Sequence, residues 1–281
     1  MKPNQVEKTA IAIRDLQIQG AINVARSALS ALRFYIVSEK PGKAGIEKSA
    51  ALLAAQRPTE PALQNLLSAV LRSGNPEKKC DKLLSEIGVD SDRIVRSGLP
   101  LVKPGSTIIT HCHASSVTSL LREARARGTR FSVLHTETRP RYQGHRTARD
   151  LVSGGIRQTM FVDSAMNYFM PEADIALVGA DALLPDGFVN KIGTSLLALS
   201  AREHGKPLYA VLGLIKFAET GKIHIEKRPV SELGFHLHGA RLENPAFDFI
   251  PKKFVRGIVC EEGILAFGEA VKAARKKVAG L

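Results

Sequence analysis

The sequence comprises 281 residues and carries 40 lysines and arginines against 27 acidic residues, a formal charge of +13. This length predicts one large domain or two modest ones, and a hydrophobic content of 44% excludes a wholly disordered chain. No run approaches the roughly 20 apolar residues of a membrane span, and the first residues lack the apolar core of a secretory signal. Cys80, Cys112 and Cys260 form neither a disulfide framework nor a zinc pattern, so we expect a cytoplasmic protein with reduced thiols.

The excess of positive charge is compatible with a nucleic acid, an acidic protein or a phosphorylated substrate as partner, and also with a solvated basic surface. One predicted helix and its end carry a cluster of basic side chains: Arg122, Arg125, Arg127 and Arg130. This cluster could meet an acidic partner or RNA, but no aromatic interleaving and no RNA-binding signature accompanies it. We therefore do not expect a nucleic acid as partner. The motifs must distinguish an acidic protein, a phosphorylated substrate and a merely solvated basic surface.

The first hundred residues have helical patterns. Apolar side chains recur at helical spacing, and helices are predicted at residues 21–32, 63–71 and 77–87. Pro58 and Pro61 stand where the second of these helices should begin, the position at which proline costs least. Turns between helices are expected at residues 40–45 and 74–76. We interpret residues 1–100 as an N-terminal α-helical domain.

From about residue 101 onward, short β-branched runs alternate with helical patterns. Strands are predicted at residues 107–110, 131–134, 159–162, 175–178, 208–212 and 257–260. Helices are predicted between them at residues 117–127, 147–152, 164–169 and 196–204. Such alternation is typical of βαβ units with a parallel sheet, so residues 101–281 are predicted to form a Rossmann-like α/β domain. Ligands of such sheets bind beyond the carboxyl ends of the strands.

The first predicted strand leads into Thr-His-Cys-His at residues 110–113 and then into small polar residues that open a helix. Free backbone N–H groups at such a turn can hold an anion. The same positive helix end lowers the pKa of a cysteine and favours its thiolate. Cys112 is therefore a candidate acid, base or nucleophile, whereas Cys80 and Cys260 are interpreted as small buried apolar side chains.

Polar residues also follow three later strands. Arg139 precedes a rigid proline and either binds a phosphate through two hydrogen bonds or is one of several arginines on a wet loop. Asp181 follows the fourth strand directly and is either a turn cap or a catalytic carboxylate. Asn190 and Lys191 could hold a second anion where the next helix begins. Lys216 follows the fifth strand and, taken alone, is interpreted as a solvated lysine, with phosphate binding as the alternative.

No nucleotide-binding motif or metal site is predicted. Walker A and G-x-G-x-x-G patterns are absent. Residues 111–113 contain three possible metal ligands, but adjacent residues of a strand point to opposite faces, which argues against a shared metal. His236 and His238 have no partners in the sequence and are interpreted as solvated. We therefore expect neither a cofactor nor a metal.

Taken in order, these motifs resemble one superfamily, formed by the α, β and δ subunits of eukaryotic translation initiation factor 2B and their sugar-phosphate isomerase relatives. The motifs are Thr-His-Cys at 110–112, Glu-Thr-Arg-Pro at 137–140, Gln-Gly at 143–144, Gly-Ala-Asp at 179–181 and Asn-Lys-Ile-Gly-Thr at 190–194. Three more fit: Gln-Gly-Ala at 19–21, Gln-Arg-Pro-Thr at 56–59 and Asn-Pro-Ala-Phe-Asp at 244–248. The resemblance thus covers nearly the whole chain, and it is the order and spacing that make it specific.

The resemblance is greatest to the archaeal type of ribose 1,5-bisphosphate isomerase. It implies an aldose–ketose isomerase of a pentose phosphorylated at C1, with Cys112 and Asp181 as the catalytic pair and no cofactor or metal. It also implies a set of residues that position the sugar and hold its phosphates: Gln19, Gly20, Ala21, Arg57, His113, Arg139, Asn190, Lys191 and Lys216.

Two alternatives stay open within the superfamily. The regulatory α subunit lacks the catalytic pair, and Gln19, His113 and the basic surface favour a noncatalytic protein that binds a translation factor. A methylthioribose 1-phosphate isomerase would need a hydrophobic pocket for a thioether, and the helical domain is short for that branch. By resemblance we also expect a homodimer, or a hexamer built from dimers.

Overall fold

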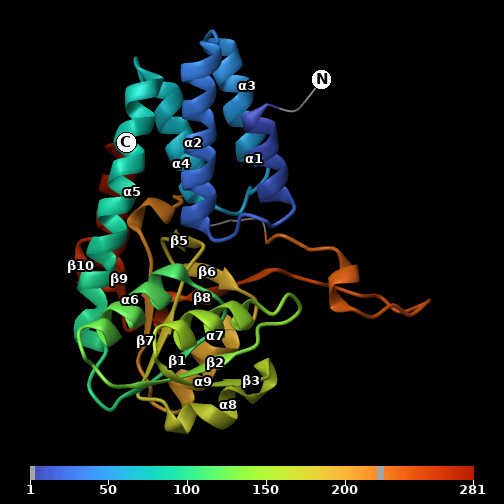
Figure 1. The fold of residues 1–281 in the computed structure, drawn as a ribbon. Helices are drawn as coiled ribbons and strands as arrows, with labels where there is room; N and C mark the ends of the chain where they lie inside the picture. The colour runs from blue at the N-terminus through green and yellow to red at the C-terminus, as the bar shows by residue number, and fades with distance from the viewer. Residues whose placement is uncertain (1–3, 220–224) are drawn as a thin grey trace.

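The computed structural model describes residues 4–219 and 225–281. Its N-terminal part is a group of five helices that stand side by side above a sheet (Figure 1). Their bounds are Gln5–Arg14 (α1), Ala21–Glu39 (α2), Lys43–Ala54 (α3), Pro61–Arg72 (α4) and Pro76–Gly98 (α5). They enclose a core of fully buried side chains that includes Leu29, Leu63 and Leu83, because each helix buries one apolar stripe against its neighbours.

The helical part differs from the prediction at three points. Helix α1 was not predicted, although Asn4 and Glu7 form a reciprocal capping box at its start. Helix α3 begins at Lys43, inside the segment expected to be a turn, because Lys40 adopts a left-handed backbone with φ of 45° and ends α2 early enough for Pro41-Gly42 to make the turn. Helix α5 is about twice as long as predicted and continues to Gly98.

The second part of the chain is built on a seven-stranded sheet with the order β10-β9-β7-β4-β1-β2-β3. The strands are Thr107–Thr110 (β1), Ser132–Thr136 (β2), Arg157–Phe161 (β3), Ile175–Val178 (β4), Leu208–Val211 (β7), Gly257–Cys260 (β9) and Gly263–Leu265 (β10). All neighbouring pairs are parallel except β9 and β10. The predicted fold class, a helical region followed by a mostly parallel α/β sheet, is confirmed.

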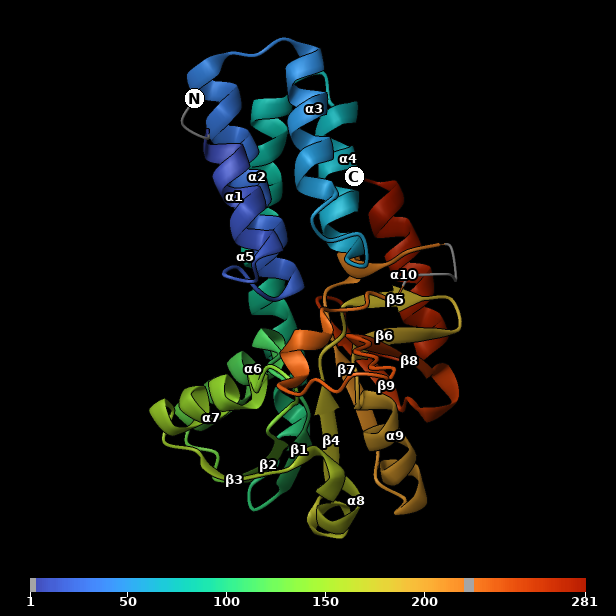
Figure 2. The same ribbon diagram turned by 90° about the vertical axis from the view of Figure 1, so that its right-hand side faces the viewer.

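Helices cover both faces of this sheet (Figures 1 and 2). They are Ser115–Ala126 (α6), Gln143–Ser153 (α7), Met166–Phe169 (α8), Thr194–Glu203 (α9) and Phe267–Ala279 (α10). One face packs against α6, α7 and the end of α5, through buried residues such as Leu120 and Leu151. The other face packs against α8, α9 and α10, through residues such as Met166, Leu197 and Val271. Among the described residues, no helix is both long and apolar enough to cross a membrane.

A small antiparallel sheet, which the sequence did not predict, stands beside the carboxyl end of β4. It consists of Ala182–Leu184 (β5), Gly187–Lys191 (β6) and Phe247–Pro251 (β8). The Pro185-Asp186 turn joins β5 to β6, and β6 pairs with β8 from some 60 residues further along the chain. The hairpin pairs Ala182 with Val189, and the Val189 carbonyl accepts the Asp181 N–H at 2.8 Å.

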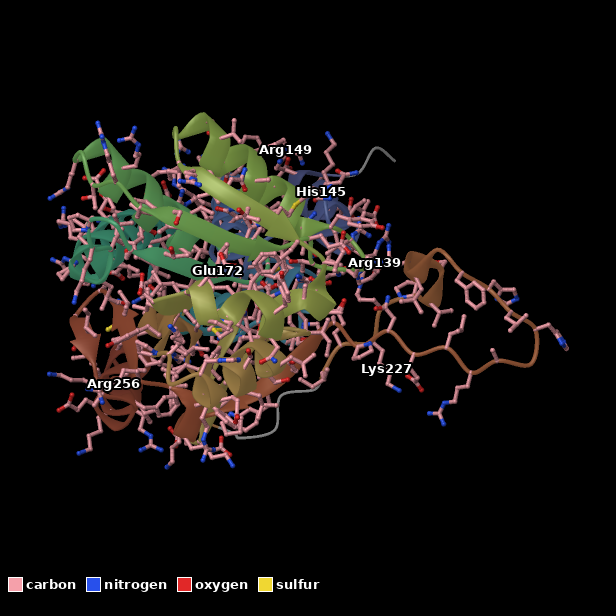
Figure 3. The ribbon with its side chains drawn as sticks, turned by 90° about the horizontal axis from the view of Figure 1, so that it is seen from below. Arg139, His145, Arg149, Glu172, Lys227 and Arg256 are labelled. Atoms are coloured by element: carbon pink, nitrogen blue, oxygen red, sulfur yellow. The ribbon has the colours of Figure 1, made fainter. Side chains whose placement is uncertain are left out.

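A long segment projects from the body of the molecule, and we call residues 226–246 the arm (Figures 1 and 3). Its two ends are tied together, because the Arg228 N–H donates to the Asn244 carbonyl and the Ala246 N–H donates to the Glu226 carbonyl, both at 2.9 Å. A short 3₁₀ helix at Val230–Leu233 lies near its base. Further out, Phe235 and Leu237 are more than half exposed.

Gly144 sets how closely α7 approaches the end of β2. A Cβ atom on this residue would lie 1.9 Å from the Thr136 carbonyl oxygen. We expect Gly144→Ala to lower the free energy of unfolding by about 3 kcal/mol or more, because backbone and helix must move apart. Urea unfolding measures this loss. The matched control is Gly88→Ala in α5, where the added methyl group meets nothing within 4 Å and is expected to add about 0.5–1 kcal/mol. Equal effects of the two substitutions would contradict the prediction.

Candidate functional site

A cavity of about 310 Å³ lies where the carboxyl ends of β1 and β4 meet the lower ends of the N-terminal helices. Parallel strands present their carboxyl ends at one edge, which is why loops distant in sequence converge here. Every predicted site residue except Arg139 lines this cavity: Gln19, Gly20, Ala21, Arg57, Cys112, His113, Asp181, Asn190, Lys191 and Lys216.

Arg139 lies outside the cavity, on the surface between the body and the arm (Figure 3). Its guanidinium donates to the Tyr142 hydroxyl at 2.5 Å and to the Leu233 carbonyl at 2.9 Å. The loop turns it outward, because Thr138 adopts a left-handed backbone and the Asp163 carboxylate accepts the N–H groups of Thr138 and Arg139. The expectation that Arg139 reaches the anion site is therefore not met by the structure, and Arg141 and Arg146 line the cavity in its place.

Cys112 occupies a strained turn between β1 and α6. Its φ is +67°, a conformation that costs a non-glycine residue roughly 1–2 kcal/mol and persists only where neighbours enforce it. The enforcing contacts come from the loop after β2 and from α7. The Cys112 N–H donates to Thr138 Oγ1 at 3.1 Å, and the Cys112 carbonyl accepts the Thr147 hydroxyl at the same distance. These contacts hold the Cys112 residue in place at the cavity wall.

Burial raises the pKa of the Cys112 thiol to about 11, although the positive charge of Lys191 lowers it and Asp181 raises it further. The expected thiolate is thus wrong for the free protein. Helix α6 begins only at Ser115, and its field weakens within the first turn, so it does not overcome the loss of water around the sulfur. The Cys112 thiol is therefore protonated at neutral pH in the free protein.

The two histidines beside Cys112 are neutral; His113 lines the cavity, whereas His111 is buried behind it. His111 is fully buried, its Nε2 donates to the Ile192 carbonyl and its Nδ1 accepts from the Thr136 hydroxyl, each at 2.7 Å. Burial lowers the pKa of His111. Burial also lowers the pKa of His113 to about 4, helped by Arg146 and opposed by Asp150. Neither imidazole therefore carries a charge at neutral pH.

Lys216 is buried, and the interpretation of it as a solvated lysine is wrong. It lies in the 3₁₀ helix Leu214–Lys216, and its ammonium donates to the Ala180 carbonyl at 2.5 Å. Burial lowers the pKa of Lys216, while the carboxylates of Asp181 and Glu60 raise it. The cavity floor thus places a lysine next to the carboxylate that the sequence proposed for catalysis.

Three helices present their N-termini to the cavity without a side-chain cap. These are α2, α6 and α7, whose first residues line the cavity and whose N-cap positions receive no side-chain hydrogen bond within the described part of the chain. By contrast, Asp248 caps α9 by accepting the N–H groups of Gly193 and Ser195. At the start of α7 the N–H groups of Gly144 and His145 donate to the carbonyls of Glu137 and Tyr142, so this helix contributes mainly its dipole. Unpaired N–H groups and the positive ends of helix dipoles favour anions. Their convergence beside several cationic side chains makes the cavity an anion-binding site in electrostatic terms.

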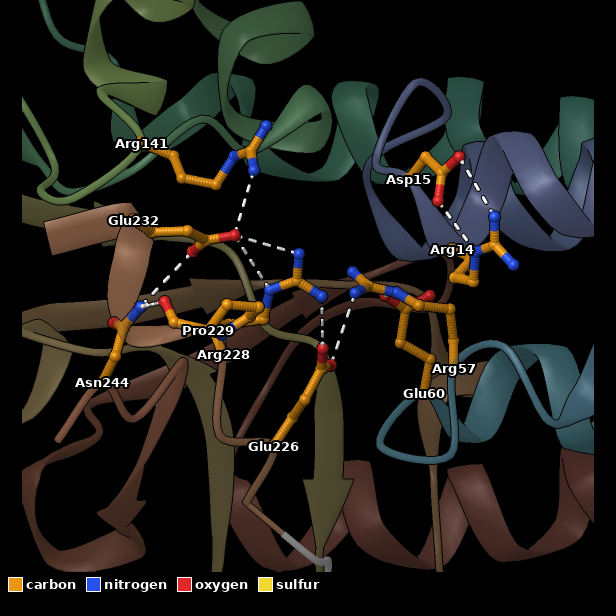
Figure 4. Close-up of polar contacts among 10 residues, drawn as sticks. All are labelled: Arg14, Asp15, Arg57, Glu60, Arg141, Glu226, Arg228, Pro229, Glu232 and Asn244. Carbon is orange, nitrogen blue, oxygen red and sulfur yellow. Dashed lines mark hydrogen bonds and ion pairs between the residues drawn. The ribbon is translucent and has the colours of Figure 1, made fainter. Parts of the chain in front are cut away.

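An alternating row of carboxylates and guanidiniums forms one wall of the site (Figure 4). Along it, the nitrogen-to-oxygen distances are 2.8 Å for Arg57–Glu60, 3.4 Å for Arg57–Glu226, and 3.0 Å for Arg228–Glu226, Arg228–Glu232 and Arg141–Glu232. The row links the α3–α4 loop, the base of the arm and the β2–α7 loop. Sequence reasoning missed its acidic members, because these residues lie in segments without strand or helix periodicity and meet only in the folded chain.

In the part of the chain that the structure describes, no three His, Cys, Asp or Glu side chains stand close enough together to hold a metal ion. The cavity's polar lining instead consists of proton donors, proton acceptors and cations. Such a set can bind phosphate groups and move protons between neighbouring atoms of a bound molecule.

Comparison with known proteins gives the same family in sequence and in structure. Residues 17–267 match the model of the initiation factor 2 subunit family. The chain is 34% identical over 280 residues to a ribose 1,5-bisphosphate isomerase of Methanocaldococcus jannaschii, covering 92% of this chain and 91% of the relative. It is also 34% identical to a methylthioribose-1-phosphate isomerase of Pelotomaculum thermopropionicum, covering 94% of this chain and 84% of that protein.

A solved structure of Pyrococcus horikoshii, described as translation initiation factor eIF-2B, superimposes with a TM-score of 0.86 at 30% identity, covering 94% of this chain and 98% of that one. The resemblance drawn from the motifs is thereby confirmed. The chain belongs to the initiation factor 2 subunit family.

Proposed function

We propose that this protein is an aldose–ketose isomerase that converts ribose 1,5-bisphosphate to ribulose 1,5-bisphosphate. One observation carries the proposal: the Cys112 thiol and the Asp181 carboxylate line the same cavity, on which three uncapped helix N-termini converge. A proton donor and a proton acceptor are what an isomerisation needs, and a bisphosphate needs anion sites. The relatives named as ribose 1,5-bisphosphate isomerases, such as that of Methanocaldococcus jannaschii, support the choice of substrate.

The phosphate on C1 locks the sugar ring, so the enzyme itself must open it. In the first half of the reaction, the Asp181 carboxylate removes the proton from C2, a double bond forms between C1 and C2, and the bond from C1 to the ring oxygen breaks. The Cys112 thiol, protonated because burial raises its pKa to about 11, gives its proton to that oxygen. The product of this half is an open-chain enol phosphate.

The second half restores both side chains. The Cys112 thiolate accepts the proton of the C2 hydroxyl, which becomes the ketone, while the Asp181 carboxyl gives its proton to C1. Lys191 lowers the pKa of the Cys112 thiol and so stabilises the thiolate between the two halves. No oxidant enters, because the hydrogen lost at C2 is regained at C1.

The cationic side chains account for the two phosphates. Arg57, Lys191 and Lys216 stand on the same cavity as Arg141 and Arg146, and helix N-termini add N–H donors that suit phosphate oxygens. We propose further that the enzyme is cytoplasmic and assembles as a homodimer or as a hexamer of dimers, as the family resemblance implies.

A second candidate is a noncatalytic subunit that binds a translation factor. It is supported by the likeness to the Pyrococcus horikoshii structure, with its TM-score of 0.86, and by Gln19, which by resemblance favours the noncatalytic α subunit. The Gln19 amide donates to the Leu16 carbonyl at 2.7 Å. A pull-down with the translation factor, titrated with salt, tests this candidate, and failure to bind at low salt counts against it.

The deciding experiment offers ribose 1,5-bisphosphate and methylthioribose 1-phosphate separately to the purified protein and follows ketose formation. We expect turnover of the bisphosphate and less of the thioether sugar, because several cationic side chains line the cavity and suit a second phosphate. Turnover of the thioether sugar alone would replace the proposed substrate. Turnover of neither would leave the noncatalytic candidate.

A further inference from the structure

Glu60 is a buried acidic residue that the mechanism above does not use. It precedes α4 and its side chain is 1% exposed. One of its oxygens, Oε1, accepts from Nε and Nη2 of Arg57 at 2.9 and 2.8 Å. The other, Oε2, is fully buried and has no hydrogen-bond partner in the described part of the chain. A buried carboxylate oxygen without a partner is costly as long as it is charged.

The surroundings of Glu60 make its charge depend on what the cavity holds. Arg57, Lys216 and Asp181 face it from the α3–α4 loop, the 3₁₀ helix after β7 and the turn after β4. Burial raises the pKa of Glu60 to about 7, Arg57 and Lys216 oppose this rise, and Asp181 adds to it. Arg57 is also the guanidinium that lines the cavity, and its remaining terminal nitrogen reaches Glu226 at 3.4 Å. The carboxylates of Glu60 and Glu226 therefore flank this guanidinium.

We propose that Glu60 takes up a proton from solvent when a dianion binds beside Arg57. The inference rests on the proposed function only in taking Arg57 as part of the anion site. A bound anion interacts with the same guanidinium that stabilises the Glu60 carboxylate, and it adds a negative charge nearby. Both effects favour the neutral carboxyl form, and Oε2 is the free atom on which the proton comes to rest. Once Glu60 is protonated, the positive charge of Arg57 is no longer neutralised by Glu60 and stabilises the bound anion.

The sign of the pH dependence follows from this exchange. Binding that takes up a proton strengthens as the pH falls, by at most about tenfold per pH unit for a single proton. The pH range over which the affinity changes begins near pH 7, where Glu60 titrates in the free protein, and lies above that pH. Among the other shifted groups that line the cavity, the pKa of His113 is about 4 and that of Cys112 about 11. Burial also lowers the pKa of Lys216, so the Glu60→Gln variant is needed to distinguish a proton taken up by Glu60 from one taken up by this lysine.

Calorimetry with sulfate tests the proposal on the full chain. Sulfate stays a dianion throughout this range, whereas phosphate titrates and would obscure the count. Titrations in two buffers of different ionisation enthalpy give the number of protons taken up per bound anion. We expect wild type to take up a substantial fraction of one proton near pH 7.5, about the middle of this pH range, and to bind sulfate several-fold more weakly one pH unit higher.

Glu60→Gln keeps the acceptor for Arg57 but carries no charge. It is expected to bind sulfate without proton uptake and with an affinity that is constant over the same range. The matched control is Glu219→Gln, an exposed carboxylate paired with Arg275, which is expected to behave as wild type. Thermal unfolding verifies that each variant is folded. If Glu60→Gln does not fold, a wild-type protein that takes up no proton still overturns the proposal.

Three results would overturn the proposal: no proton uptake by wild type, equal uptake by Glu60→Gln, or no binding of sulfate by either protein. The isomerase assay answers a separate question. Proton-linked sulfate binding without ketose formation would refute the proposed function and leave the role of Glu60 intact. Ketose formation with no proton linkage would do the reverse.

Discussion

Asp181→Asn is expected to lower the turnover of ribose 1,5-bisphosphate by about 10²–10⁴-fold, the range typical of a lost general base. The amide has nearly the same shape but cannot remove the C2 proton. Because Asp181 makes no ion pair with the residues at 4–219 and 225–281, we expect KM to change far less than kcat. The measurement is steady-state ketose formation over a range of substrate concentrations.

Asp186→Asn is the matched control, since Asp186 lies exposed in the turn between β5 and β6 and is expected to leave both constants unchanged. A second readout concerns Cys112, whose pKa Asp181 raises. The neutral amide should therefore lower the pKa of the Cys112 thiol, which titration of the thiol with an alkylating reagent detects. Full turnover by Asp181→Asn would exclude the carboxylate as the base.

Cys112→Ser should lower kcat by about 10²–10³-fold, because a hydroxyl gives up its proton far less readily than a thiol. Cys260→Ser is the control, since Cys260 is buried under α10 away from the cavity, and it is expected to leave kcat unchanged. Retention of wild-type turnover by Cys112→Ser would rule out the thiol as donor.

The wild-type protein provides an independent check on the state of Cys112. With a pKa of about 11, its thiolate fraction at neutral pH is on the order of 100-fold below that of an ordinary cysteine. Alkylation at pH 7 should therefore be slow and should accelerate steadily as the pH is raised toward 11. Rapid alkylation at neutral pH would mean that Cys112 begins the reaction as a thiolate, and the order of proton transfers would have to be reversed.

The sheet was predictable where single strands are short, apolar and buried on both faces. Strands β1, β4 and β9 begin and end at the predicted residues, since each is a β-branched or apolar run with four buried or nearly buried side chains. The hairpin of β5 and β6 was not predicted, because its pairing with β8 depends on a chain segment about 60 residues away. Local periodicity holds no information about such a contact.

The site divides in a similar way. Cys112 and Asp181 were foreseeable as neighbours, because each follows a strand of the same parallel sheet and β1 pairs with β4. The outward turn of Arg139 and the burial of Lys216 were not foreseeable, because both depend on loop contacts such as those of Asp163 and Ala180. The protonation of Cys112 also required the structure, since burial outweighs the helix field that the sequence alone suggested. The domain boundary near residue 100 stays a prediction.

The left-handed backbone at Cys112 lowers the stability of the fold, and the protein retains it together with a thiol at the proposed catalytic position. Glycine adopts that conformation without penalty, so a chain selected for stability alone would carry glycine at position 112. The protein instead keeps a thiol there, and Thr138 and Thr147 hold the unfavourable turn through hydrogen bonds to the Cys112 backbone. Gains in heat resistance sought by relaxing this turn would therefore come at the expense of the proton donor, and stabilising changes are better placed far from it.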